Sequence, residues 1–244
     1  MANDPVEIHV LDKKVRLLQP ADGFRTSLDS VFLGAACPAK SGQRILDMGS
    51  GVGGAAFCLL WRVVGCHVVG VEIQASHAEM ARTNIGLNAM EGRADFIVSD
   101  IAAFQTDAPF DHAICNPPYL EAGTYTPSPS NERAMALGHE GRETTLKDWI
   151  DAGFRNLKSG GSLTIIHRAD MTDKIIAGLG KRFGAVEIIP LYPRLGQEAK
   201  RVIVRAVKDR KTPAKLHAGL ILHEADGAYT AAADAILRDG AAIE

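Results

Sequence analysis

The 244-residue sequence has few of the features that mark a secreted, metal-binding or membrane protein. Its four cysteines form no CxxC pair and no metal-ligand spacing with the eight histidines, so we expect reduced, mostly buried thiols and no metal. The first residues lack the basic segment and apolar core of a signal peptide. The most apolar stretch, residues 55–71, is interrupted by Arg62 and His67 and is too mixed to span a bilayer. These absences predict a cytoplasmic protein without a membrane partner.

The chain also lacks a strong overall charge. Its 27 basic and 29 acidic residues give a formal net charge of −2. No general basic field therefore indicates a polyanionic partner, and any basic surface must be local.

Short apolar strands alternate with amphipathic helices from residue 44 onward. Because the strands are continuously apolar and separated by helices, we expect a parallel sheet covered on both faces. The last two strands, with little sequence between them, are predicted to pair antiparallel. The expected strands are 44–49, 67–73, 94–100, 110–116, 161–168, 184–192 and 200–208, and the expected helices between them are 55–63, 76–88 and 146–157. This is an α/β, Rossmann-like, seven-stranded and mostly parallel sheet.

Segments at both ends flank this core. Residues 6–19 predict a β-hairpin and a helix begins near Leu28, so residues 1–43 form an N-terminal extension and residues 44–210 the core. Residues 211–244 carry a strand and an alanine-rich helix that we expect to extend the same domain. Residues 121–143 are polar and rich in Pro, Ser and Gly, and a loop of this length is usually functional or disordered.

A glycine-rich turn follows the first core strand in "ILDMGSGVGGAA". Gly49, Gly51 and Gly53 allow a tight turn and a close approach of a ligand to the backbone at a helix N-terminus. On its own, such a turn is often only a strand-to-helix connection. Glu72 ends the next strand 21 residues after Gly51, where a carboxylate can accept ribose hydroxyls, and Asp100 ends the third strand.

The spacing of this turn indicates which nucleotide cofactor it holds. Dinucleotide folds read G-x-G-x-x-G, whereas this turn reads G-x-G-x-G-G after Asp47. It resembles the S-adenosylmethionine loop of Rossmann-like methyltransferases. The resemblance implies that Gly49 and Gly51 pack against the methionine end of the cofactor and that Asp47 orients its amino group. It also implies that Glu72 binds the ribose, and Asp100 with Ile101 the adenine.

The fourth strand stops at "NPPY", which consists of Asn116, Pro117, Pro118 and Tyr119. Both prolines end regular structure because they lack a backbone donor. The Asn116 amide oxygen and the Pro117 carbonyl can accept the two N–H groups of a planar amine, and Tyr119 can stack on the ring. In isolation the tetrapeptide could equally be a β-turn. After a complete cofactor loop it is the signature of methyltransferases that act on planar nitrogens.

The resemblance extends over nearly the whole chain, through "TSLDS", "SPSNERA", "PRLGQEAKRVIVRA" and "HEADGAYT". Together these segments are similar to the tRNA1(Val) (adenine-N6)-methyltransferase family, which implies tRNA as a partner and an anticodon-loop adenine as the methyl acceptor. A protein glutamine, another planar amine, or a catalytically silent S-adenosylmethionine-binding scaffold remain alternatives. Release-factor glutamine methyltransferases usually carry an N-terminal helical domain, and about 43 residues before the core are too few for one.

The remaining candidate residues are predicted to lie near the cofactor or to contact RNA. By resemblance Asp29 lies near the methionine end of the cofactor, although it could equally be a helix cap. Arg194, Lys200 and Arg201 flank the last strand turn and could neutralise phosphates, or simply form a solvated edge. Arg133 in the long loop is a further candidate if that loop closes over the base.

Overall fold

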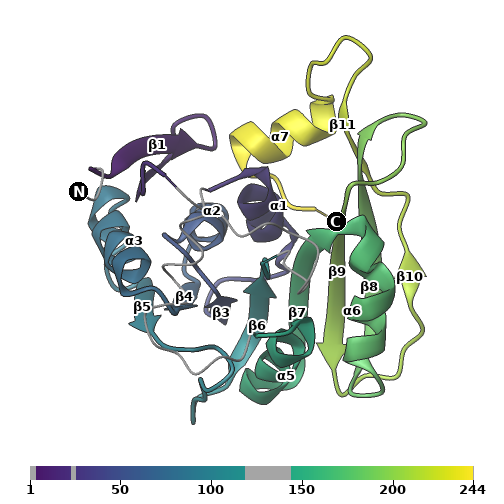
Figure 1. Ribbon diagram of the computed structural model, residues 1–244, viewed down its shortest axis with the longest axis horizontal. Helices are drawn as coiled ribbons and strands as arrows, with labels where there is room; N and C mark the ends of the chain where they lie inside the picture. The colour runs from purple at the N-terminus through teal and green to yellow at the C-terminus, as the bar shows by residue number, and fades with distance from the viewer. Residues whose placement is uncertain (1–3, 23–25, 119–143, 244) are drawn as a thin grey trace.

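A computed structural model describes residues 4–22, 26–118 and 144–243 of the chain. The predicted roles of Tyr119 and Arg133 therefore fall outside the described residues. Figure 1 shows one large sheet with helices packed against it and a small N-terminal hairpin at one end.

The large sheet contains the seven expected strands and two short additions. β9 is antiparallel to both of its neighbours, β7 and β8, and all other paired strands are parallel, so the predicted antiparallel hairpin and mostly parallel sheet are confirmed. The strands in spatial order are β10 (Lys215–Leu216), β8 (Phe183–Arg194), β9 (Arg201–Lys208), β7 (Leu157–Arg168), β6 (Phe110–Cys115), β3 (Arg44–Met48), β4 (His67–Glu72) and β5 (Ala94–Val98). The second addition, β11 (Leu220–His223), pairs with β8 beyond β10 because β8 is long enough to accept both.

Helices cover both faces because successive strand residues point to opposite sides and both sets are apolar. Ile45 of β3 belongs to one hydrophobic cluster and the next residue, Leu46, belongs to the other. The first cluster includes residues of α1 (Leu28–Ala36), α2 (Gly54–Arg62), α3 (Ala75–Leu87) and α7 (Ala231–Asp239). The second cluster includes residues of α5 (Leu146–Asn156) and α6 (Thr172–Leu179). A short 3₁₀ helix, η1 (Ala169–Met171), directly precedes α6. The sequence prediction did not include α6.

The N-terminal hairpin consists of β1 (Val6–Val10) and β2 (Val15–Gln19), as predicted. Val15 and Leu17 of β2 are fully buried in the first cluster. At the turn, the Lys14 Nζ donates to the carbonyl of Arg238 at 2.7 Å, which brings the end of α7 beside the hairpin (Figure 1). The chain divisions at residues 43 and 210 stay predictions.

The cysteines agree with expectation, and two histidines are hydrogen-bonded within the core. All four cysteines are free and buried. His112 bonds Ser162 through Nδ1 at 2.8 Å and Gln43 through Nε2 at 3.0 Å. The Nδ1 of buried His167 accepts the Arg168 N–H. Within the described ranges, no helix is both long and apolar enough to cross a membrane, and no cluster of three or more His, Cys, Asp or Glu could hold a metal.

Candidate active site

The strand order creates a crevice at the carboxyl ends of β3 and β6. The chain leaves β3 and returns in β4 on one side, whereas β6 lies on the other side of β3. Open α/β sheets bind ligands at such a reversal, outside the carboxyl ends of the strands. A pocket of about 200 Å³ lies here.

Many of the predicted site residues meet in this pocket. Those that line it are Gly49, Gly51, Glu72, Asp100, Ile101, Asn116 and Pro118. They lie at the carboxyl ends of four neighbouring strands. In the sequence they are up to 69 positions apart, from Gly49 to Pro118. The sheet edge therefore assembles the glycine turn and the "NPP" segment around one cavity.

The glycine turn is held open on its ligand side. The N–H groups of Gly49 and Ser50 both donate to the carbonyl of Val71, at 2.8 and 3.1 Å. A Cβ on Gly49 would lie 2.5 Å from the ring of Trp149, so only glycine fits there. A Cβ on Gly51 would meet no atom within 4 Å. The backbone of Gly51 therefore forms a bare floor that a ligand can approach.

Glu72 fixes the turn and still has accepting capacity. Its side chain is 7% exposed at the end of β4. Oε2 accepts the Gly51 N–H and Oε1 accepts the Gln74 N–H, each at 2.9 Å. A carboxylate has about four lone-pair positions, so two backbone bonds leave room for ligand hydroxyls.

Asp47 and Gly53 support the turn without lining the pocket. Asp47 is 2% exposed, and its Oδ2 has no hydrogen-bond partner in the described part of the chain. Burial raises the pKa of Asp47 to about 8, opposed by the Ala56 N–H and reinforced by the charge of Glu72. Gly53 has φ 91° at the start of α2, where a Cβ would lie 2.5 Å from the Phe57 ring.

Asn116 brings an unpaired amide oxygen to the pocket. It follows β6 directly, and its buried Oδ1 lacks a hydrogen-bond partner among residues 4–22, 26–118 and 144–243. Pro117 is buried beside it, and Pro118 is exposed. Asp100 starts a turn after β5, where its Oδ1 accepts the Ala102 N–H at 2.8 Å, while Ile101 is 5% exposed.

Among the lining residues that sequence reasoning missed are Trp149 and His77. Trp149 lies in the first turn of α5, which begins with a capping box between Thr145 and Asp148. His77 lies in the first turn of α3. The indole Nε1 of Trp149 and both ring nitrogens of His77 are buried and have no hydrogen-bond partner in the described structure. The available signal was positional, since both helices begin at the carboxyl edge of the sheet.

The other predicted residues do not line the pocket. The Asp29 carboxylate pairs with Arg201, with Nε and Oδ2 3.0 Å apart, and both side chains are partly buried. Arg194 and Lys200 are exposed on either side of the β8–β9 turn. The predicted roles of Asp29 toward the cofactor and of these basic residues toward RNA stay predictions.

Comparison with known proteins identifies the family. Residues 27–131 match the family model of the methyltransferase small domain. A relative from Aeromonas hydrophila, named tRNA1(Val) (adenine(37)-N6)-methyltransferase, is 31% identical over 210 residues, covering 85% of this chain and 86% of the relative. The chain belongs to the tRNA1(Val) (adenine-N6)-methyltransferase family. It is an S-adenosylmethionine-dependent methyltransferase, and the predicted family, enzyme class and cofactor are confirmed.

Solved structures share the fold. A "predicted O-methyltransferase" from Agrobacterium tumefaciens is 29% identical, with a TM-score of 0.73 over 88% of this chain and 98% of that one. A putative class I S-adenosylmethionine-dependent methyltransferase from Listeria monocytogenes is 21% identical, with a TM-score of 0.56 over 79% of this chain and 62% of that one. The class I architecture of the sheet is thus confirmed.

The pocket residues fit this cofactor on structural grounds. The bare backbone of Gly51 could receive it, and the free lone pairs of Glu72 suit the ribose hydroxyls. The unpartnered Oδ2 of Asp47 suits a cationic amino group, since a buried carboxylate without a partner is costly.

Proposed function

We propose that this methyltransferase modifies the exocyclic N6 of an adenine in tRNA, and that the adenine lies in the anticodon loop of a valine tRNA. The name of the Aeromonas relative, which aligns with most of both chains, supports this substrate. The observation that carries the chemistry is the buried Oδ1 of Asn116, which has no hydrogen-bond partner among the described residues and lies in a pocket shared with Gly51 and Glu72.

An exocyclic amine needs help to accept a methyl group, because its lone pair is delocalised into the ring. The Asn116 Oδ1 and the Pro117 carbonyl accept its two N–H groups and favour a pyramidal nitrogen. The fixed φ angle of each proline restricts the backbone on both sides of this carbonyl, which keeps the carbonyl preorganised. The bound cofactor supplies an electrophilic methyl group on a sulfonium. As the bond from nitrogen to the methyl carbon forms, the carbon–sulfur bond breaks and S-adenosylhomocysteine would be the leaving group. The methylated amine becomes more acidic and would release one proton to solvent without a strong base.

The remaining site residues, in and beneath the glycine turn and around the pocket, hold the cofactor in this proposal. Glu72 accepts the ribose hydroxyls, Asp47 orients the amino group, and Asp100 with Ile101 borders the adenine. Gly49, Gly51 and Gly53 give the turn its shape. Trp149 closes the pocket above Gly49, since its ring occupies the space that a Cβ would fill.

One aromatic residue and several basic residues are assigned to the RNA. Tyr119 stacks on the target base, which is splayed from the loop as unpaired bases are in most specific RNA recognition. Arg194 and Lys200 are exposed at the carboxyl end of β8 and neutralise phosphates. Arg201 contributes less because Asp29 already pairs with it. A tRNA substrate also fits the expected cytoplasmic location.

The test is to trace a labelled methyl group. The enzyme is incubated with methyl-labelled S-adenosylmethionine and either total tRNA or a protein extract, and the digested tRNA is analysed by mass spectrometry. The proposal predicts N6-methyladenosine in valine tRNA. Label found only in protein would instead support a glutamine acceptor, and no label in either substrate, with S-adenosylhomocysteine still bound by the protein, would support a silent cofactor-binding scaffold.

A further inference from the structure

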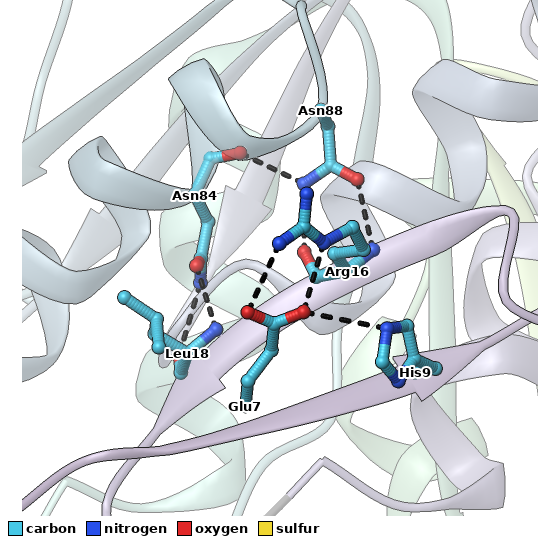
Figure 2. A network of polar contacts seen from close by, with 6 residues as sticks. All are labelled: Glu7, His9, Arg16, Leu18, Asn84 and Asn88. Carbon is cyan, nitrogen blue, oxygen red and sulfur yellow. Dashed lines mark hydrogen bonds and ion pairs between the residues drawn. The ribbon is translucent and has the colours of Figure 1, made fainter.

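Asn84 of α3 and Asn88, the C-cap residue directly after that helix, attach the N-terminal hairpin in the same way (Figure 2). Asn88 accepts the Arg16 N–H at 2.9 Å and donates to the Arg16 carbonyl at 2.7 Å. Asn84 accepts the Leu18 N–H at 2.7 Å and donates to the Leu18 carbonyl at 3.1 Å. Residues four apart on a helix and two apart on a strand lie on one side of each element. Each carboxamide therefore pairs with β2 as a neighbouring strand would.

The second amide hydrogen of each asparagine bonds a different kind of acceptor. That of Asn88 goes to the Asn84 carbonyl within α3, at 2.8 Å. That of Asn84 leaves the helix and bonds the Val52 carbonyl at 3.0 Å. Val52 lies between Gly51 and Gly53, inside the cofactor turn. Asn84 is fully buried and has its donors and its acceptor in use.

The bond to Val52 is one of the polar contacts that hold the glycine-rich turn. Glycines lose much conformational freedom when they are ordered, so the shape of a glycine-rich turn depends on its fixed polar contacts. Glu72 holds the Gly51 N–H on one side of Val52, and the Gly53 N–H bonds the Ser50 carbonyl at 2.8 Å. Asn84 holds the Val52 carbonyl itself. Without that bond, a nearly buried carbonyl would lose its partner, because Val52 is 6% exposed.

We propose that Asn84 is a positioning residue, through which the N-terminal hairpin holds the cofactor turn in its binding shape. The hairpin acts on the reaction without touching the pocket, since Leu18 and Val52 share the same amide. This inference rests on the proposed role of the turn in holding S-adenosylmethionine.

The experiment compares Asn84→Ala with the matched control Asn88→Ala. Both variants lose two bonds to β2, but only Asn84→Ala loses the bond to Val52. Affinity for S-adenosylhomocysteine is measured by calorimetry, and stability by thermal unfolding without ligand. We expect Asn84→Ala to bind about fivefold to tenfold more weakly, the value of one hydrogen bond, and Asn88→Ala to bind as the parent does. Both are expected to unfold at lower temperature.

Trp149 gives a second readout, because its ring contacts Gly49 of the turn. In a Trp61→Phe background, Asn84→Ala should change the emission of Trp149, and saturating S-adenosylhomocysteine should restore it. Asn88→Ala should leave the emission unchanged. If Asn84→Ala does not fold, Asn84→Ser is tested in the same way as a smaller truncation.

Two outcomes overturn the inference. One is parental affinity and emission in the Asn84 variant, and the other is an equal loss of affinity in both variants. Failure of the parent itself to bind S-adenosylhomocysteine would instead contradict the proposed cofactor site.

Discussion

The hairpin interface and the pocket treat buried amides in opposite ways. Asn84 uses its oxygen and one amide hydrogen on Leu18 (Figure 2) and its other amide hydrogen on the Val52 carbonyl. Asn116 keeps a buried oxygen without a partner in the described structure, as does Asp47. Most buried polar groups in proteins are hydrogen-bonded, so unpaired ones gathered at one sheet edge call for an external partner. The satisfied amide supports the fold, and the unsatisfied one indicates where a ligand binds.

The same contrast separates two histidines. His112 has a partner on each ring nitrogen, and burial lowers its pKa to about 4, so it is a neutral core residue at pH 7. His77 lines the pocket, and neither of its nitrogens has a hydrogen-bond partner among the described residues. Burial alone therefore does not distinguish these two histidines, whereas the hydrogen bonding of their ring nitrogens within the described structure does.

The largest expected effect comes from Gly51→Ala. The new methyl group meets no protein atom within 4 Å and projects where the ligand would lie. A left-handed alanine costs about 1–2 kcal/mol, which lowers the melting temperature by only a few degrees in a chain of this size. We expect the affinity for S-adenosylhomocysteine to fall by about 100-fold or more in calorimetry.

Gly49→Ala provides the contrasting variant for that prediction. Its methyl group would overlap the Trp149 ring, so it should destabilise the protein more than Gly51→Ala does. A Gly51→Ala variant that binds the ligand normally would mean that the turn does not contact the cofactor.

A smaller effect is expected at Asp47, and it depends on pH. Its pKa in the folded protein is about 8, above the ordinary value of 3.8, so ionisation of Asp47 destabilises the ligand-free fold progressively as pH rises from about 4 to about 8. Asp47→Asn removes this cost. Its melting temperature relative to the parent should therefore rise between pH 5 and pH 8, while its affinity for S-adenosylhomocysteine falls about tenfold. A pH-independent difference in melting temperature would show that Asp47 is not the titrating group.

The smallest expected effect tests the two histidines. His77→Ala should weaken S-adenosylhomocysteine binding by about threefold, roughly the value of one neutral hydrogen bond, with little change in melting temperature. His112→Ala should leave binding unchanged and lower the free energy of unfolding by about 2 kcal/mol, because Ser162 and Gln43 lose their partner. The reverse pattern in calorimetry and thermal unfolding would remove the distinction between the two sites.

The sequence predicts most of this fold because its signals are local. Continuous apolar runs, glycine turns and proline stops define the seven strands, and the carboxyl-edge rule brings Gly51, Glu72 and Asn116 together. Helix α6 was missed because it spans two turns and only Ile175 and Leu179 are buried. A pattern of two apolar residues is too short to establish a period.

Contacts between distant segments explain the rest. The pairing of Asp29 with Arg201 joins residues 172 positions apart, and nothing in either local sequence indicates the other. The local sequence does not distinguish Trp149 and His77 from other helix residues, because tertiary packing is what places them at the pocket. Asn84 is likewise one polar residue in α3 until β2 and Val52 lie beside it.

The most direct test of the account is Asn116→Ala, measured for binding and turnover together. The account predicts affinity for S-adenosylhomocysteine within about twofold of the parent, and single-turnover methylation of unmodified valine tRNA slowed by at least about 100-fold, the usual effect of removing a preorganised group of this kind. Methylation at the parental rate would contradict the role of the Asn116 oxygen.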